Sequence, residues 1–444
     1  MAYLPVIILH GWSDTSNSFR NLAGWLEQNG FNVIDIYLGD YLSMNDEITL
    51  FDLGAAFGQA LKDRNISQNR FSFDVIVHST GGLVIREYLR QFCAGNASRT
   101  PVKHLCMMAP ANFGSPLARL GKSVLGRLFK GWSWDHFGQT GENILNALEL
   151  ASPYSWQLAE ADLFDANFKI FDCSNTITTV LAGTAPYSDY LRSTVHENGS
   201  DGTVRVSTAN LNAHYFTLDF ADITKPIFSS HPRNVDSIAF AVFARDHTEM
   251  HDPNAKEQME AWGKIVLDAL TIESKDYDRH LTQCNSLTRK TFADGMNGRN
   301  KELFHQYQHV VFRVQDQFGQ AIPDYVVEFY QEEDDPKDKV FNKVHSEILE
   351  KVSTNSSNAS YRSFLFDTTD LCNYLDSAKE PDIQMSISAA NISRRILYRN
   401  PVTGISVFSG KKRDFLFPNE PVLVDVTLYR EQAAEVFELA KFSA

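Results

Sequence analysis

Short apolar runs alternate with segments of helical hydrophobic spacing along the first part of the chain. The run Val6-Ile7-Ile8-Leu9 contains no polar residue and predicts a buried strand. Apolar positions three and four apart between Phe19 and Gln28 predict a helix, which Gly30 would end. We expect further strands at 33–37, 73–77, 102–108, 178–181 and 238–243, and further helices at 50–63, 82–92 and 254–270. Near-continuous apolar strands separated by helices indicate a parallel sheet covered on both faces.

Residues 113–170 interrupt this alternation. The segment is helix-like and rich in aromatic residues, namely Phe129, Trp132, Trp134, Phe137, Tyr154 and Trp156. An insertion of this length in an α/β enzyme is typical of a lid or a substrate-binding cap. The alternative is an extra pair of helices packed on the core.

The pattern changes after about residue 275 to strand alternation without long helices. Strands are expected at 309–314, 325–330, 361–367, 383–390, 405–408 and 422–429. We therefore predict a C-terminal β-domain over 305–444, sandwich-like and all-β, joined to a catalytic domain over 1–275 by a polar junction at 276–304. A chain of 444 residues favours two domains, because one core stops growing at roughly 250–300 residues.

The last stretch, 431–444, predicts an amphipathic helix. It carries Ala433, Val436, Phe437, Leu439, Ala440 and Phe442. Large apolar side chains are costly to leave in water, so we expect this tail to bury against its own chain, a second copy of the chain or a bilayer surface. Self-association or recognition of a lipid interface would then be tasks of the C-terminal domain.

Charge and cysteine usage exclude some functions. A formal net charge of −14 argues against nucleic acid as a partner, since phosphate binding needs a basic field. The five cysteines are odd in number and scattered, which does not indicate a disulfide framework, and no Cys/His cluster has metal-ligand spacing. The first apolar run lacks a basic region before it, and no run reaches the ~18 residues of a membrane span. We expect a cytoplasmic or peripherally membrane-associated protein.

A candidate nucleophile lies where a strand meets a helix. Ser79 sits in His78-Ser79-Thr80-Gly81-Gly82, directly after the strand at 73–77. This is the context of the nucleophile elbow of α/β-hydrolases, whose tight turn needs small neighbours, and Gly81 supplies one. Val77 stands where that motif usually has its first glycine, so the match is incomplete. The alternative is a structural serine in a strand–helix turn.

Acyl transfer also needs donors for the developing oxyanion. One is expected to be the backbone N–H of Thr80, directly after the nucleophile. The segment His10-Gly11-Trp12 follows the first strand, and the N–H of Trp12 would be the second donor. His10 is expected to shape this loop, with a role as base as the alternative. Because backbone amides do this work, we expect no cofactor and no metal ion.

In this fold the acid precedes the base along the chain. The polar loop Ser200-Asp201-Gly202-Thr203-Val204 favours Asp201 as the acid, with Asp189 and Asp222 as alternatives. For the base, His247 follows the apolar run at 238–243 and is followed two residues later by Glu249. The alternatives for the base are His251 and His231.

These residues together resemble a known family. The segments that carry the resemblance are His10-Gly11-Trp12, His78-Ser79-Thr80-Gly81-Gly82, 109–116 and 200–204, followed by a β-rich C-terminal domain. The chain resembles the PlaB-type bacterial phospholipases A, which carry an H-S-T-G-G nucleophile motif. The resemblance implies phospholipase A and lysophospholipase A activity, bacterial membrane association without a signal peptide, and a triad of Ser79, Asp201 and His247.

The sequence leaves two other functional hypotheses open. One is a neutral lipase or a carboxylesterase acting on smaller substrates. The other is a non-catalytic binding protein with a hydrolase fold, which the presence of candidates for all three triad positions disfavours. We therefore expect serine-dependent hydrolysis of lipid esters through an acyl-enzyme, a phospholipid or lysophospholipid substrate, a membrane surface as partner, and a homo-oligomer.

Overall fold

The computed structural model describes residues 3–10, 19–36, 46–120, 141–187, 196–331, 339–377, 381–393, 396–409 and 413–432. Spatial proximity divides the chain into two compact units. Unit 1 comprises Met1–Ala213, Pro232–Tyr307 and Pro418–Pro421, and unit 2 comprises His214–His231, Gln308–Phe417 and Val422–Ala444.

Unit 1 is built on a six-stranded parallel sheet in the order β2-β1-β3-β4-β5-β8. The strands are β1 Val6–Leu9, β2 Val33–Ile36, β3 Phe73–His78, β4 Val102–Met108, β5 Ile177–Gly183 and β8 Ala239–Phe243. Every residue of β1, β3, β5 and β8 is buried, which explains the continuous apolar runs in the sequence. The predicted parallel sheet and α/β-hydrolase fold class are confirmed.

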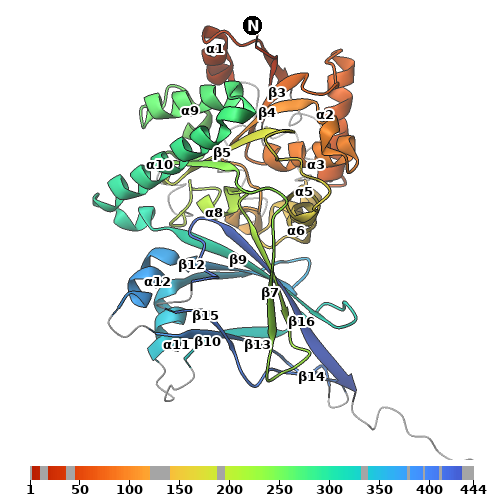
Figure 1. Cartoon of the computed structure of the whole chain (residues 1–444), viewed down its shortest axis with the longest axis vertical. Helices are drawn as coiled ribbons and strands as arrows, with labels where there is room; N and C mark the ends of the chain where they lie inside the picture. Colours follow the sequence, from red (N-terminus) through yellow and green to blue (C-terminus); the bar gives the residue numbers. More distant parts are fainter. Residues whose placement is uncertain are drawn as a thin grey trace, which may run out of the picture. The chain divides into compact units, whose positions relative to one another are not determined.

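Helices cover both faces of this sheet (Figure 1). They are α1 Arg20–Gln28, α2 Leu50–Asp63, α3 Gly81–Cys93, α9 Met259–Thr271 and α10 Tyr277–Met296. Helices α1 and α9 share one apolar core with the strands, through Leu22, Leu26 and Trp262 among others. Helix α2 begins at a capping box, in which Thr49 and Asp52 satisfy each other's backbone N–H groups.

Helix α10 occupies much of the segment that the sequence indicated as a polar junction. It belongs to unit 1 and lies along β8, the last strand of the sheet. Thr288 Oγ1 accepts from the backbone N–H of Val242 at 3.1 Å, and Thr291 Oγ1 donates to the Val242 carbonyl at 2.9 Å. The polar residues of α10 thus satisfy backbone groups that an edge strand would otherwise expose.

Part of the 113–170 insertion packs on α3. Its described elements include a short 3-10 turn Pro116–Leu120, α5 Glu142–Leu148, α6 Pro153–Ala159 and a π-helical turn Glu160–Phe164. Asp162 forms a buried ion pair with Arg86 of α3 at 2.7 Å, and Tyr154 Oη donates to Glu87 at 3.0 Å. Tyr154 and Asp162 of the insertion thus bind side chains of α3. Residues 121–140, with four of the six aromatic residues, lie outside the described ranges.

Unit 2 contains two sheets around one core. The larger has the order β11-β12-β9-β16-β6-β7 with β14 beside β16, and the smaller has the order β10-β13-β15. Phe312 and Val424 from the larger sheet and Val327 and Ile387 from the smaller one belong to the same buried cluster, which agrees with a sandwich-like arrangement. The strands are β6 His214–Asp219, β7 Ile227–His231, β9 Tyr307–Asp316, β10 Tyr325–Tyr330, β11 Leu349–Thr354, β12 Tyr361–Asp367, β13 Ile383–Ala389, β14 Ile396–Arg399, β15 Ile405–Phe408 and β16 Pro421–Gln432.

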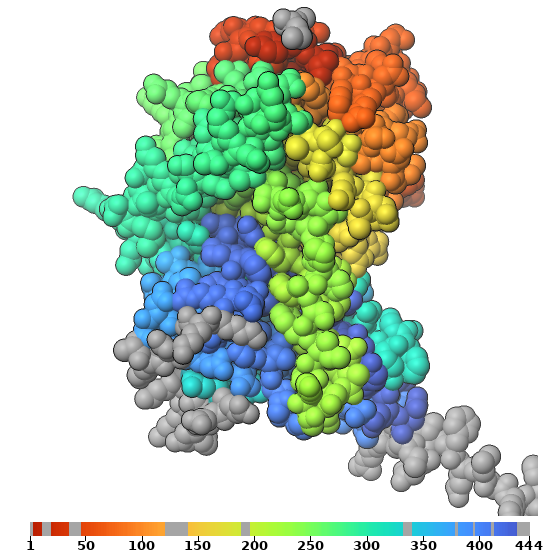
Figure 2. Space-filling model, viewed as in Figure 1, coloured from red at the N-terminus to blue at the C-terminus, as the bar shows by residue number. Residues whose placement is uncertain are grey.

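Unit 2 differs from the sequence expectation in three details. Short helices accompany the strands, α11 Lys339–Lys343 and α12 Thr368–Leu375, and α12 contributes Leu371 and Leu375 to the core. The β6–β7 hairpin, expected within the catalytic domain, pairs here with β16, parallel through β6. The side chains of β7 are mostly exposed, and the hairpin lies at the surface (Figure 2).

The third difference concerns the expected C-terminal helix. Glu431 and Gln432 are the last residues of β16 and pair with β14, because the strand continues past the point where helical spacing was predicted to begin. The rest of the predicted tail, 433–444, lies outside the described residues. Within the ranges that the structure describes, no helix has both the length and the apolarity needed to cross a membrane.

Candidate active site

The candidate residues follow strands of the parallel sheet at their carboxyl ends. Ser79 comes directly after β3, Asp201 lies in the loop after β5, and His247 lies in the loop after β8. Parallel strands present their carboxyl ends at one edge of a sheet, which is where open α/β folds bind ligands. The topology therefore brings three segments together that are far apart in the sequence.

Ser79 occupies a strained turn between β3 and α3. Its φ is 55°, a region that non-glycine residues rarely adopt. The Ser79 N–H donates to the Met108 carbonyl at 3.2 Å, and the Ser79 carbonyl accepts from Gly82 at 3.1 Å and from Ala111 at 3.2 Å. Neighbouring backbone thus holds the serine in the geometry expected of a nucleophile elbow.

The two glycines of the motif are required by close packing around the elbow. A Cβ on Gly81 would lie 2.7 Å from the Leu9 carbonyl oxygen, and one on Gly82 would lie 2.7 Å from Cβ of Pro110. Both distances are shorter than real Cβ contacts. The motif usually has another glycine two residues before the serine. Here that position is Val77, a buried strand residue.

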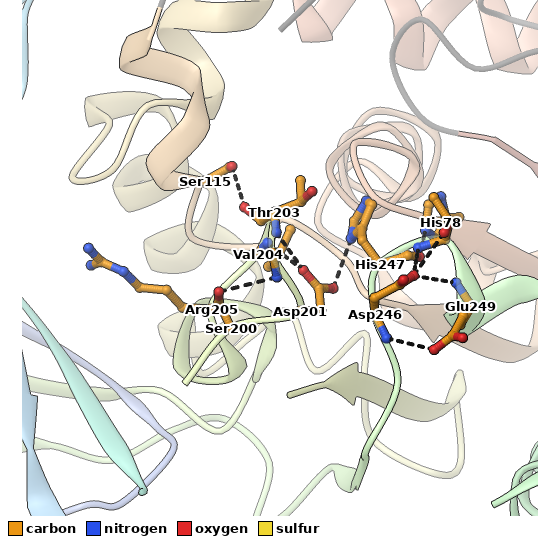
Figure 3. Close-up of polar contacts among 12 residues, drawn as sticks. His78, Ser115, Ser200, Asp201, Thr203, Val204, Arg205, Asp246, His247 and Glu249 are labelled. Atoms are coloured by element: carbon orange, nitrogen blue, oxygen red, sulfur yellow. Dashed lines mark hydrogen bonds and ion pairs between the residues drawn. The ribbon is translucent and has the colours of Figure 1, made fainter. Parts of the chain in front are cut away.

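Asp201 and His247 form a buried hydrogen-bonded pair (Figure 3). The Asp201 Oδ2 atom lies 2.8 Å from His247 Nδ1, and each side chain is only 1% exposed. Asp201 Oδ1 accepts from the backbone N–H groups of Thr203 at 2.9 Å and Val204 at 2.7 Å. Three donors therefore hold the carboxylate in place, and its bond to Nδ1 orients the imidazole.

Two side-chain hydrogen bonds hold the loop that carries Asp201. Ser115 Oγ donates to the Thr203 carbonyl at 2.6 Å, and the hydroxyls of Tyr187 and Thr203 are hydrogen-bonded at 2.7 Å. A single polar residue in the insertion and one after β5 thus fix the turn that carries Asp201. Ser115 and Tyr187 were not among the sequence candidates.

The loop that carries His247 is organised by a buried arginine. The guanidinium of Arg245 donates to the carbonyl oxygens of four residues at 2.8–3.1 Å, namely Glu249, Asp252, Ala255 and Glu257. It also lies over the ring of Trp262 at 4.8 Å. Burial lowers the pKa of Arg245 to about 10, so it remains a cation at neutral pH. Sequence reasoning missed this residue, because an arginine after a strand has no distinctive pattern.

The Nε2 atom of His247 is buried and has no hydrogen-bond partner among the described residues. The His247 ring lies 4.4 Å from the ring of His78, the residue before Ser79. A base with one nitrogen held by a carboxylate and the other bare, next to the elbow, can accept a proton from a serine hydroxyl. Thr80 is the N-cap of α3, where the first backbone N–H groups have no partner within the helix.

The alternative candidates lie elsewhere or have other contacts. Asp222 and His231 belong to unit 2, in the β6–β7 hairpin, and both are exposed. The His251 ring packs against His78 at 4.7 Å and against Phe19 at 4.3 Å. His10 is buried, with its ring 6.2 Å from Phe19. Three predicted residues, Gly11, Trp12 and Asp189, lie outside the described ranges.

Comparisons with known proteins support this fold. Neither a protein-family model nor a curated protein sequence matches the chain. The structure of phospholipase PlaB from Legionella pneumophila is similar with a TM-score of 0.83 and 24% identity, covering 100% of this chain and 97% of that one. PlaB in complex with thio-NAD is similar with a TM-score of 0.81 and 24% identity, covering 99% and 97%. The chain therefore has, over both of its units, the α/β-hydrolase fold with a C-terminal β-rich region that phospholipase PlaB has.

Proposed function

We propose that this chain is a serine hydrolase that cleaves carboxylic ester bonds in phospholipids and lysophospholipids. The observation that carries the proposal is the buried Asp201–His247 pair, whose bare Nε2 lies beside the elbow that holds Ser79 at a φ of 55°. A binding protein with a hydrolase fold would have no need of a strained serine and an oriented imidazole. The resemblance of the motifs and the whole-chain similarity to PlaB support the choice of substrate class.

The first half-reaction acylates the serine. Ser79 Oγ attacks the ester carbonyl carbon while His247 Nε2 takes the hydroxyl proton, and Asp201 stabilises the imidazolium that forms. The negative charge on the carbonyl oxygen is held by the Thr80 N–H, with the Trp12 N–H as the expected second donor. The intermediate then collapses, the bond to the alcohol oxygen breaks, and His247 returns the proton to that oxygen.

The second half-reaction releases the fatty acid. Water attacks the carbonyl carbon of the acyl-enzyme, and His247 Nε2 again takes the proton. When this intermediate collapses, the bond to Ser79 Oγ breaks and the serine recovers its proton from His247. A diacyl phospholipid would thus give a lysophospholipid and a fatty acid, and a lysophospholipid would lose its remaining acyl chain.

We also propose that the chain contacts a membrane surface and associates with further copies of itself. The resemblance implies membrane association, and the exposed apolar residues Phe318, Ile392 and Val402 in unit 2 are compatible with a lipid or protein partner. The sequence also predicts an apolar tail at 433–444, whose side chains would suit the same kinds of partner.

The direct test is a panel of phospholipids, lysophospholipids, triglycerides and short esters, with release of free fatty acid as the readout. Ser79→Ala should lower turnover by on the order of 10³-fold or more with the fold intact, and it should abolish labelling by a fluorophosphonate probe. Ser98→Ala is the matched control, because Ser98 is exposed and its backbone N–H and hydroxyl both donate to the nearby Asn96 Oδ1. Wild-type hydrolysis by Ser79→Ala would refute the assignment, and a preference for triglycerides over phospholipids would refute the substrate class.

A further inference from the structure

The main chain of His247 is held from two sides. Its backbone N–H donates to the Asp201 carbonyl at 2.9 Å. Its carbonyl oxygen lies 3.0 Å from Nε2 of His78. Because a carbonyl oxygen only accepts, the hydrogen of this bond must be on Nε2 of His78, which leaves Nδ1 as the bare nitrogen. That Nδ1 is buried and has no hydrogen-bond partner among the described residues.

The surroundings of His78 keep its ring neutral. The residue is 3% exposed, and burial lowers its pKa well below the ordinary 6.5. The neighbouring imidazoles of His247, His251 and His10 lower the pKa further, since each would repel a second positive charge, while the bond to the His247 carbonyl opposes them. Among the described residues, the ring of Phe19 also faces it, at 5.7 Å between centroids. His78 is therefore a neutral donor with one fixed tautomer.

The sheet by itself does not link the serine to the base directly. In the strand order, β4 and β5 lie between β3, which leads to Ser79, and β8, which leads to His247. The bond from His78 crosses this interval, because His78 is the residue immediately before Ser79 and its partner is the peptide of His247 itself. One short polar contact thus joins the two segments whose separation decides whether a proton can pass between them.

We propose that His78 is a positioning residue that sets the distance between Ser79 and His247 through its hydrogen bond to the His247 carbonyl. The inference rests on the proposed serine-hydrolase function and goes beyond it, since it assigns a role to a residue that does not touch the substrate. A displacement of a catalytic group by about 1 Å can lower the rate about 100-fold. Loss of this single hydrogen bond is therefore enough to affect turnover.

The test compares three substitutions of His78 on a short soluble ester. His78→Leu removes the donor. His78→Gln keeps it, because the glutamine amide nitrogen can occupy the place of Nε2. His78→Asn keeps an amide but is too short to reach the carbonyl, and it replaces the leucine variant if that one does not fold. We expect kcat to fall about 10- to 100-fold in the leucine and asparagine variants with KM nearly unchanged, and glutamine to restore most of the loss.

The readouts separate this idea from the proposed function. Suppose that the wild-type protein hydrolyses esters and is labelled at Ser79. If a folded variant without the donor at position 78 then keeps the wild-type kcat, the positioning role alone is overturned. The positioning role is also overturned if the glutamine variant has no higher kcat than the leucine or asparagine variant at equal thermal stability. His78 would then contribute through packing and not through its hydrogen bond. Wild-type protein that neither hydrolyses esters nor reacts with a fluorophosphonate overturns both proposals.

Discussion

The substitution Asp201→Asn tests the acid of the proposed triad, because the structure dictates how the new amide must orient. Among the described residues, Oδ1 of Asp201 accepts two backbone N–H groups, while Oδ2 accepts only from His247 Nδ1. If the asparagine turned its NH₂ group toward the backbone, that group would meet the N–H groups of Thr203 and Val204, which are also donors. Both backbone N–H groups would then have no acceptor. At about 1–3 kcal/mol for each buried unpaired donor, that orientation costs roughly 2–6 kcal/mol.

The asparagine oxygen therefore stays on the backbone side, and its NH₂ group faces His247. The imidazole must then accept at Nδ1 and carry its hydrogen on Nε2, the nitrogen that should take the serine proton. The wrong tautomer and the lost carboxylate charge together should lower kcat by on the order of 10³- to 10⁴-fold. Folding should be almost unaffected, since the two backbone hydrogen bonds at Oδ1 are kept.

The assay is steady-state hydrolysis of a short soluble ester, with circular dichroism and a melting curve to verify the fold. Asp222→Asn is the matched control: that carboxylate is exposed and accepts from Thr224 at 2.9 Å, a bond that an asparagine oxygen can also accept. The reasoning is refuted if Asp201→Asn keeps more than about a tenth of the wild-type kcat, or if Asp222→Asn proves equally damaging.

Three further expectations concern stability and the tail. Arg245→Met should lower the free energy of unfolding by about 3–5 kcal/mol in urea titrations, because four buried or half-buried hydrogen bonds to carbonyl oxygens are lost, and Arg245→Lys should recover only part of it. An unchanged midpoint would contradict this expectation. Burial lowers the pKa of His280 from 6.5 to about 4, so the unfolded chain binds the proton first and stability should decline as pH falls from 6.5 toward 4. The decline should be smaller in His280→Gln, and equal slopes would argue against it. Deleting 433–444 should lower activity on phospholipid vesicles more than on a soluble ester, and equal activity with unchanged light scattering would remove any role for the tail.

The pattern of the sequence was sufficient to predict the parallel sheet and the tight turn at Ser79. Strands buried on both faces are mostly apolar, so their positions are visible as runs, and the helices between them show the spacing of one buried side. The turn at Ser79 could be predicted because it is local: strand, serine, two glycines and helix are contiguous in the chain. The packing of Leu9 and Pro110 against those glycines gives the physical reason for the motif.

Other features depended on contacts between distant segments. The β6–β7 hairpin has an alternation that fits any half-buried sheet, and only its parallel pairing with β16, two hundred residues away, assigns it to unit 2. Helix α10 lies in the segment that was predicted to be a junction because it is rich in polar residues. Those residues serve the edge of β8, a use that cannot be seen without the neighbouring strand.

The acid and the base illustrate the same division. The order of residues limited the acid to Asp201, Asp189 or Asp222 and the base to His247, His251 or His231, since any polar loop after a strand can carry either group. The tertiary structure pairs Asp201 with His247, and it shows the hydrogen bonds that Arg245 and His78 make to the loop of His247. Local sequence determines which backbone shape a segment takes, but hydrogen bonds between loops after different strands exist only once the sheet has set those strands side by side.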